Sequence, residues 1–431
     1  MIRQYSFLIF VSVIIFAFFI TFDADPQVET YRSITDTGTV KSVEMKENHL
    51  EIHTGKTLIK SYDKEQTVKP GDVITFSGKL MSSEYYIQKY QNHSYTTYLK
   101  ARNINYISYP KSIEVKGHKK GIYSIRGRFT EILDTHIDRL YRSDSPIFKA
   151  LFYGNKSELD EFTKTSFSRT GTAHILALSG FHTGIILVFI NFALMSIPVR
   201  QRGSAACIIL IIYAFLTGLR PSIIRAVVFF VIYYISFIKE QRYSLISSAF
   251  ITAALMATVN PYYIYDVGYQ LSFASVISIA IFMPVAQKYG IPSFISVTLS
   301  AQILTLPMVI YYFNVMPLTG VAANFLVIPL ISLAMALFLV SMMFYAASLI
   351  IPFTFIFAKY VSHGAIMIKD LMLSVNIMFE NLPYSYLENI ETDIWKIGLY
   401  YGIILVIYKL WEIKIIKENL YEFEKLPKII T

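Results

Sequence analysis

The sequence predicts a polytopic α-helical membrane protein with a small β-barrel domain near its N-terminus. Three observations support this fold class. The 431 residues are 54% hydrophobic, and the mean hydropathy of +0.47 lies above that of soluble domains. Long apolar segments fill the chain from residue 172 onward, whereas residues 28–115 alternate between apolar and polar side chains. The net charge of +9 suits anionic partners, which include phospholipid head groups, nucleic acid and acidic solutes.

Residues 1–25 are expected to form an uncleaved transmembrane anchor whose N-terminus lies in the cytoplasm. Arg3 precedes an apolar run from Phe7 to Ile20, and the residues after the run, 23–26, do not make a convincing small-residue cleavage site. A signal peptide is the alternative interpretation. An uncleaved anchor in this orientation places residues 23–170 on the extracytoplasmic side.

Residues 26–118 are expected to form the barrel. Short β-prone runs occur at 40–45, 49–53, 56–61, 73–80, 103–109 and 112–115. So many short strands in one small domain favour an OB-like barrel, a fold that commonly binds single strands with a basic groove and stacked aromatic rings. The alternative is that the tyrosines fill the core or loops and the lysines form a solvated face. The candidate DNA-binding residues are Lys79, Tyr85, Tyr86, Lys89, Tyr90, Tyr98, Lys100 and Arg102.

Residues 119–170 are expected to form an amphipathic helical linker. Apolar residues recur at helical spacing from Ile122 to Leu140, and basic residues gather at the start of this segment. Such a helix suits either a bilayer surface or packing on other helices, and phospholipid contact is favoured over contact with nucleic acid. Further along, Ser157 is expected to cap a helix that begins with three acidic residues within 158–161. Three basic residues of this region are also candidates for DNA binding: Lys119, Lys120 and Arg126.

Residues 171–411 are expected to form the membrane body, followed by a charged tail at 412–431. Prolines and glycines within the apolar segments predict interruptions, at Gly180 and Gly184 in the first segment and at Pro307 and Pro329 in later ones. The apolar segments cover 172–198, 205–219, 221–238, 244–259, 263–286, 293–313, 319–349, 351–376 and 394–411.

The distribution of basic residues predicts the orientation of the body. Arg200 and Arg202 follow the first segment, Lys239 and Arg242 close the third, and Lys288 ends the fifth. Because positive residues favour the cytoplasmic side, these alternate gaps are expected there. The protein is therefore expected to be a multi-pass protein of the cytoplasmic (inner) membrane. The side of the C-terminal tail depends on the span count and stays open.

Several polar groups lie within the apolar segments, where they are costly unless they face protein, water or a substrate. Arg220 and Arg225 flank the start of the segment at Pro221. Snorkelling to the membrane interface is the alternative for Arg220, whereas Arg225, a turn deeper, is expected to face protein or a polar path. Hydrogen bonding between helices is the alternative for most of the others. The candidate residues of a substrate path are His174, Ser179, Gly180, His182, Arg220, Arg225, Gln270, Ser272, Gln302 and Asn324.

Ser179 and His182 invite a catalytic interpretation because serine–histidine pairs can hydrolyse esters or peptides. A triad also needs a carboxylate, and the sequence has no acidic residue between Glu161 and Glu240. It also has no HExxH motif and no dense cluster of metal ligands. We therefore expect no enzyme, no metal and no cofactor. An intramembrane hydrolase remains the lesser alternative, beside a secondary transporter for a small anionic solute.

The run from Phe167 to Gly184, FSRTGTAHILALSGFHTG, resembles the signature of the ComEC family of competence DNA-uptake channels. Four further stretches match the same family in the same order, and the resemblance covers most of the chain. They are GLRPS with Arg225-Ala226, Asn260-Pro261 with DVGYQLSF, SAQ with Thr305-Leu306-Pro307, and Ala323-Asn324-Phe325 with Ile328-Pro329.

The resemblance implies a channel that admits single-stranded DNA across the cytoplasmic membrane during natural transformation, with the OB-like domain outside. It also implies an external DNA receptor, a cytoplasmic ATP-driven translocase and contact with membrane lipid, and it leaves monomer and homo-oligomer open. Many relatives carry a metallo-β-lactamase-like domain that is proposed to degrade the other strand. We expect this chain to lack it and to need a separate nuclease. The single cysteine, Cys207, cannot form the disulfide thought to brace the domain in some relatives.

Overall fold

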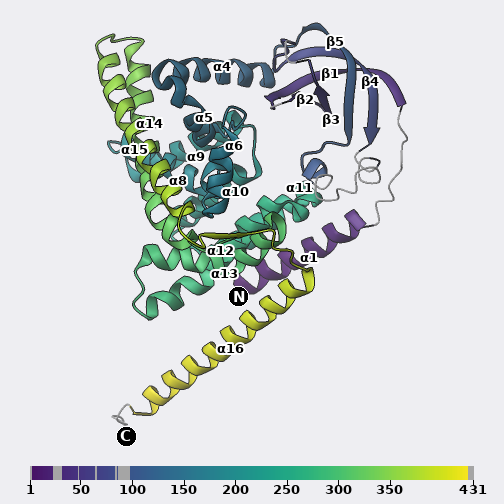
Figure 1. The fold of residues 1–431 in the computed structure, drawn as a ribbon. Coiled ribbons are helices and arrows are strands. Elements are labelled where there is room, and N and C mark those ends of the chain that lie inside the picture. The colour runs from purple at the N-terminus through teal and green to yellow at the C-terminus, as the bar shows by residue number, and fades with distance from the viewer. Residues whose placement is uncertain are drawn as a thin grey trace.

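The computed structural model describes residues 2–22, 32–46, 48–63, 66–82, 85 and 98–425. It shows a β-barrel beside a larger body of helices, with the helix α4 running between them (Figure 1). The first helix, α1 (Ile2–Phe22), packs against α11 (Leu245–Val259) of the body. The hydroxyl oxygen of Thr21 in α1 lies 3.0 Å from that of Tyr265, so the predicted N-terminal anchor is part of the helical body.

The barrel is closed and has five strands, in the order β1-β2-β3-β5-β4. All neighbouring strands are antiparallel except β3 and β5, which are parallel. Alternating apolar side chains, such as Ile52, Ile74 and Phe76, fill its interior. The predicted small N-terminal barrel is confirmed. The strands are β1 (Arg32–Met45), β2 (Leu50–Thr54), β3 (Thr57–Ser61), β4 (Asp72–Ser82) and β5 (Tyr106–His118).

The two runs predicted separately at 103–109 and 112–115 form the single strand β5. The register between β4 and β5 shifts next to Gly78. A β-carbon at Gly78 would lie 2.5 Å from the carbonyl oxygen of Tyr109 and 2.6 Å from the Cα of Pro110. Glycine is therefore required where the two backbones approach most closely, and Pro110 fits within the strand at this irregularity.

The helix α4 (Ile122–Tyr141) confirms the helix predicted from apolar spacing. Its first turn is tied to the barrel through His118, whose Nδ1 lies 2.8 Å from Oδ1 of Asp72 and whose Nε2 lies 2.7 Å from Oγ of Ser124. Lys69 of the barrel adds an ion pair of 2.8 Å with Glu131. These contacts fix α4 to the barrel, so the barrel helps to determine where the residues on the first turns of α4 lie.

Two short helices, α5 (Ser145–Tyr153) and α6 (Glu161–Arg169), follow α4 after a single 3-10 turn, η1 (Arg142–Asp144). The predicted cap at Ser157 is wrong. Asp160 caps α6 by accepting a hydrogen bond of 2.6 Å from the backbone N–H of Thr163. Ser157 does not cap because α6 begins only at Glu161; Ser157 lies in the preceding turn, where its N–H and hydroxyl both donate to the side-chain oxygen of Asn155, at 3.1 and 2.6 Å. This turn leaves residues 154–160 as a loop on the surface of the body.

Among the residues that the structure describes, six helices are long and apolar enough to cross a membrane, which supports the predicted multi-pass architecture. Three shorter apolar segments, Tyr5–Thr21, Gly180–Ala193 and Leu245–Val259, accompany them. The six spans are α9 (Val199–Leu216), α10 (Pro221–Ile238), α12 (Val267–Lys288), α13 (Ser293–Phe313), α14 (Gly320–Ser348) and the first part of α16 (Ile394–Lys425).

The segment predicted at 351–376 forms α15 (Thr354–Glu380), which packs along α14 (Figure 1). It is not among the six spans. It carries Lys369, which is only 5% exposed and pairs through Nζ with Asp144 at 2.5 Å. The last helix, α16, projects away from the body (Figure 1), continues through part of the predicted tail, and contacts α13 through hydrogen bonds from Tyr400 and Tyr401 to backbone carbonyls.

The predicted interruptions at Pro307 and Pro329 are wrong, because α13 and α14 run through both prolines. A proline removes one backbone donor, and transmembrane helices tolerate this when neighbouring groups and local adjustments satisfy the freed carbonyl. The interruption predicted at Gly180 is found just before that residue, whereas the one predicted at Gly184 is wrong, because α8 runs through Gly184. A short helix, α7 (Ala173–Leu176), ends there, and α8 (Gly180–Ala193) begins after three residues, 177–179.

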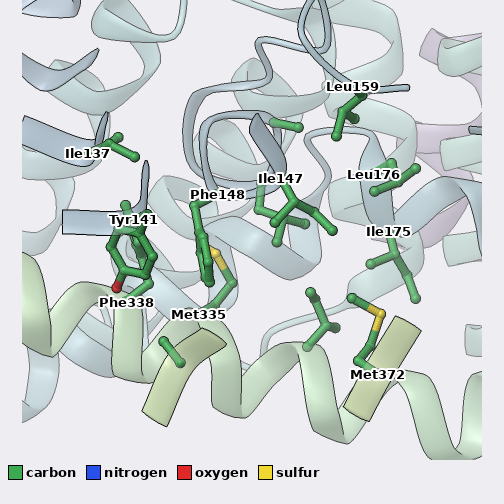
Figure 2. Packing of buried hydrophobic residues seen from close by; sticks show 14 of the residues in the cluster. Ile137, Tyr141, Ile147, Phe148, Leu159, Ile175, Leu176, Met335, Phe338 and Met372 are labelled. Atoms are coloured by element: carbon green, nitrogen blue, oxygen red, sulfur yellow. The ribbon is translucent and has the colours of Figure 1, made fainter. Parts of the chain in front are cut away.

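The main hydrophobic core forms where α4, α5, α14 and α15 meet (Figure 2). Phe148 of α5 stacks on Phe338 of α14 with ring centroids 5.4 Å apart, and Tyr141 lies beside both rings. The hydroxyl oxygen of Tyr141 lies 2.6 Å from that of Ser341. Fully burying one such ring stabilises by about 1.5–3 kcal/mol, so this core holds α5 and the loop after it against the body.

Candidate nucleic-acid interface

The broken helix between α7 and α8 has a packed side and an open side. On the packed side, the backbone N–H of Ser179 donates to Nδ1 of His182 at 3.3 Å, and the Ser179 hydroxyl lies 3.1 Å from the same nitrogen. His182 is fully buried. On the open side, His174 and Gly180 are exposed, and a β-carbon at Gly184 would meet no atom within 4 Å. The break therefore presents the N-terminus of α8 beside free space.

Two arginines from different elements approach this region, each packed on a glycine. Arg220 lies in the turn between α9 and α10, and its Cζ would be 2.8 Å from a β-carbon at Gly154. That β-carbon would also lie 2.8 Å from Cδ1 of Leu178, beside the helix break. Arg126 of α4 lies against Gly218 of the same turn, with Nη2 2.6 Å from the corresponding position. The loop after α5, the α9–α10 turn and α4 thus meet next to the break.

The charges at this meeting point repel one another. Burial lowers the pKa of the Arg126 guanidinium, and the like charge of Arg220 lowers it further. Burial also lowers the pKa of the Lys156 ammonium, to about 8, with Arg220 and Lys164 adding to the effect. Within the described ranges, the side chains of Arg126, Arg220 and Lys156 form no hydrogen bond or salt bridge. A cluster of partly buried cations without paired anions is a site for an anionic ligand.

One carboxylate of the barrel faces this cluster without pairing to it. Burial is the largest influence on the pKa of Arg220 and lowers it, while Glu44 of β1 opposes that effect. The Glu44 carboxylate itself pairs with Lys46 at 3.0 Å. Its pKa is lowered although burial acts in the other direction, because Lys46 and, more weakly, Arg220 favour the charged form. The acid therefore contributes to the field of the cluster and leaves the guanidinium N–H groups unoccupied.

A second set of cations joins the barrel to the body. The guanidinium of Arg102 lies over the ring of Tyr98 at 3.9 Å and also donates to its hydroxyl. Lys100 lies over the ring of Tyr262 in η2 (Pro261–Tyr265) at 5.1 Å. Asn260 anchors this segment by donating to the carbonyl of Ala101 at 3.0 Å. Paired rings and cations of this kind match the stacked bases and phosphates of a single strand.

The other candidates of the barrel and linker lie apart from this cluster or cannot be placed. Lys79 is exposed on β4, Tyr85 is half-buried, and Lys119 and Lys120 are exposed between β5 and α4. Two candidates, Tyr86 and Lys89, lie outside the described residues, as does Tyr90.

The deeper candidates are engaged with protein. Arg225 of α10 is 5% exposed, and its guanidinium lies 5.5 Å from the ring centroid of Phe273 in α12. Gln270 donates to the carbonyl of Ile264 at 2.9 Å and accepts from the Tyr312 hydroxyl at 2.7 Å. Arg225 thus faces protein, and Gln270 links helices.

The remaining candidates of the path are also within the body. Ser272 and Gln302 are half-buried, and Asn324 is buried. The side-chain oxygen of Asn324 has no partner among the groups that the structure describes. These positions suit contacts between helices, and the structure places none of them beside Arg126, Arg220 and Lys156.

Three residues of the cluster were not among the sequence candidates. Lys156, Gly154 and Gly218 follow or flank helix ends, and each has an ordinary local explanation as a turn residue. The sequence offers one signal for them, the short motif GNKS at 154–157. The closeness of the two glycines to Arg126 and Arg220 is seen only in the tertiary structure.

The matching family model is that of the Competence protein, over residues 151–414. The chain belongs to this family. The match includes the loop with Lys156, the broken helix and Arg220, and it begins after the barrel and Arg126. Two curated relatives of the Competence-family chain are similar over part of their length. ComE operon protein 3 of Bacillus subtilis (strain 168) is 27% identical over 184 residues, which cover 41% of this chain and 24% of that protein.

An uncharacterized protein of Aquifex aeolicus (strain VF5) is 28% identical over 169 residues, which cover 39% of this chain and 40% of that protein. The aligned region therefore spans less than half of either relative. No solved structure matches this Competence-family chain.

Proposed function

We propose that this Competence-family protein is a channel that passes single-stranded DNA across the cytoplasmic membrane during natural transformation. One observation carries the proposal. Arg126, Arg220 and Lys156 come from three separate elements, meet beside a broken helix, and have no salt-bridge partner in the part of the chain that the structure describes. A polyanion carries a negative charge at every repeating unit. It therefore supplies the missing counter-charge to these cations at each step as it moves past them.

The strand enters between the barrel and the body. The Tyr98–Arg102 and Tyr262–Lys100 pairs place aromatic rings and cations, the groups that contact bases and phosphates in single-strand binding proteins, along this entrance. The phosphates then meet Arg126 and Arg220. Beyond them lies the N-terminus of α8, whose helix dipole and free N–H groups favour negative charge. The open side at Gly180 and Gly184 gives the strand room.

The barrel and residues 23–170 lie outside the cytoplasm in this proposal. Arg200 near the start of α9 pairs with Glu240 just after α10 at 3.3 Å, so these two helix ends lie together. Arg220 lies at the opposite ends of the same two helices, next to Gly154. The positive-inside tendency supports a cytoplasmic position for the Arg200 end and an external one for Arg220 and the barrel.

The proposal assigns no chemistry to the chain itself. Ser179 and His182 face each other across 3.1 Å, and no described carboxylate orients the imidazole. We accordingly propose that an external receptor supplies the DNA, that a cytoplasmic ATP-driven translocase pulls it, and that a separate nuclease removes the other strand. The domain division at 1–25, 26–118, 119–170, 171–411 and 412–431 is part of this proposal. Membrane lipid surrounds the body, and a homo-oligomer is compatible with it.

A secondary transporter for a small anionic solute is the second candidate, because unpaired arginines beside a broken helix also suit a carboxylate or phosphate. The barrel and its ring–cation pairs have no role in that function. Competition between a small anion and bound poly(dT) distinguishes the transporter from the DNA channel. If the site binds a polymer, the small anion releases poly(dT) only at concentrations high enough to screen charge as any salt does.

The test is entry of labelled DNA into the cytoplasm of cells that lack their own copy and carry this chain or a variant. We expect Arg220→Gln to lower uptake by about tenfold, since a hydrogen bond to a charged group contributes about 1.5–3 kcal/mol. Arg200→Gln is the matched control, because Arg200 is exposed and pairs with Glu240. Uptake that is unchanged when the whole chain is deleted would refute the channel.

A further inference from the structure

Two glycines of the site hold backbone conformations that favour glycine, and an arginine guanidinium packs against each of them. Gly154 has φ +79° at the end of α5, and Gly218 has φ +87° in the α9–α10 turn. A β-carbon at Gly218 would lie 2.6 Å from Nη2 and 2.8 Å from Cζ of Arg126. A β-carbon at Gly154 would lie 2.8 Å from both Cζ and Nη1 of Arg220. Each guanidinium thus occupies the space that any other side chain would fill.

These contacts interlock three elements in a fixed order. Arg126 of α4 packs on Gly218 of the α9–α10 turn, and Arg220 of that turn packs on Gly154 of the loop after α5. The same loop carries Lys156 two residues later. One chain of contacts therefore sets the relative positions of all three cations.

The backbone alone explains part of this pattern. The N–H of Gly154 donates to the carbonyl of Lys149 at 3.1 Å, and the N–H of Gly218 donates to that of Phe215 at 3.1 Å, as glycines at helix ends commonly do. Gly290 ends α12 in the same way with φ +78°, yet a β-carbon there would meet nothing within 4 Å. Ending a helix does not require a guanidinium to lie on the glycine.

We infer that Gly218 and Gly154 are positioning residues that seat the guanidinium groups of Arg126 and Arg220 toward the phosphates of the bound strand. This inference rests on the proposed function. A methyl group at Gly218 must displace the guanidinium by about 0.8 Å to restore ordinary contact of 3.4 Å. Because the displaced atoms are the far end of a flexible side chain, the fold absorbs the change while the hydrogen bonds to phosphate lengthen or tilt.

The experiment measures binding of fluorescent poly(dT) to the full chain in detergent, for Gly218→Ala, Arg126→Gln and the double variant. We expect each single variant to raise Kd by about tenfold and the double variant to match Arg126→Gln alone, because the methyl group then has no guanidinium to displace. Gly290→Ala, which carries the same backbone strain without the contact, should bind as the wild type does.

Effects that multiply in the double variant would overturn the inference, since a purely backbone role acts whether or not Arg126 is present. Unfolding temperatures are measured for every variant. Should Gly218→Ala fail to fold, Gly218→Asn replaces it, because asparagine tolerates left-handed backbone and still places a β-carbon against Arg126.

Inorganic polyphosphate is the second probe, and it distinguishes failure of the positioning role of Gly218 from failure of the proposed function. If polyphosphate binds with the same dependence on Arg126 and poly(dT) does not bind, the positioning role is supported and the DNA channel is refuted. If poly(dT) binds and the effects of the two substitutions multiply, the DNA channel is supported and the positioning role of Gly218 is refuted. If the wild type binds neither polymer, both are refuted.

Discussion

Neutralising the three unpaired cations should change how strongly salt weakens DNA binding. Each phosphate that a single strand presents to a cation contributes about 0.7 to the slope of log affinity against log salt concentration. Arg126, Arg220 and Lys156 have no salt-bridge partner among the described residues, so each is free to neutralise one phosphate. The triple glutamine variant should therefore lose about 2 from the slope. Between about 50 and 200 mM salt, this corresponds to an affinity loss about 20-fold smaller than that of the wild type.

The assay is fluorescence anisotropy of labelled poly(dT) with the full chain in detergent across that salt range. Single variants should each lower the slope by about 0.7. Lys396→Gln is the control, because Lys396 is exposed and already pairs with Asp393 at 2.9 Å. A triple variant that keeps the wild-type slope would refute the placement of these cations on the strand, even if its affinity falls.

Three further predictions concern single groups. Burial lowers the pKa of Lys156 to about 8, so its charge is lost as the pH rises through that value; poly(dT) affinity should fall between about pH 7 and 9 in the wild type and stay level in Lys156→Arg. Asp144→Asn removes one of the two carboxylates that pair with the buried Lys369 and should lower the free energy of unfolding by about 1.5 kcal/mol in chemical denaturation, since Asp370 still pairs with Nζ at 2.5 Å; an unchanged free energy of unfolding would contradict the pairing. Ser179→Ala should cost about 1 kcal/mol of stability through the lost contact with His182 and leave poly(dT) binding intact; a stable variant without binding would reopen a direct role for Ser179.

Local patterns predicted most of the architecture. The barrel strands follow from alternation, α4 from apolar spacing, and the spans from hydropathy, because each of these signals depends on residues close together in the sequence. The break before α8 was also predictable, since Gly180 and Gly184 weaken a helix where Ser179 and His182 can cap the next one.

The errors arise where a neighbour overrides a local preference. Ser157 has the right chemistry for a cap, but it lies in a turn with Asn155 before α6 begins, and Asp160 caps α6 instead. Prolines usually interrupt helices, but α13 and α14 continue through Pro307 and Pro329. Such outcomes depend on which partners surround a residue, and sequence reasoning about one residue does not include them.

The candidate site was predictable in part. Arg126 and Arg220 were named for different reasons, one as a basic residue of the linker and the other as a charge at the membrane. Their proximity depends on how α4 crosses the α9–α10 turn, which is a tertiary property. Lys156 was missed because the short motif GNKS does not by itself indicate a role, and the place of Lys156 in the cluster follows only from its burial near Arg220.

The origin of each cation explains why the site needs the barrel. Arg220 belongs to the membrane helices and Lys156 to a loop held by the main core, whereas Arg126 belongs to α4. The His118 contacts with Asp72 and Ser124 bind the first turn of α4 to the barrel. The barrel and the body therefore both hold α4, and with it Arg126 beside Gly218. In the proposed channel, the helix that joins the barrel to the body also supplies one of the cations that receive the strand, so the position of this cation depends on both parts of the protein.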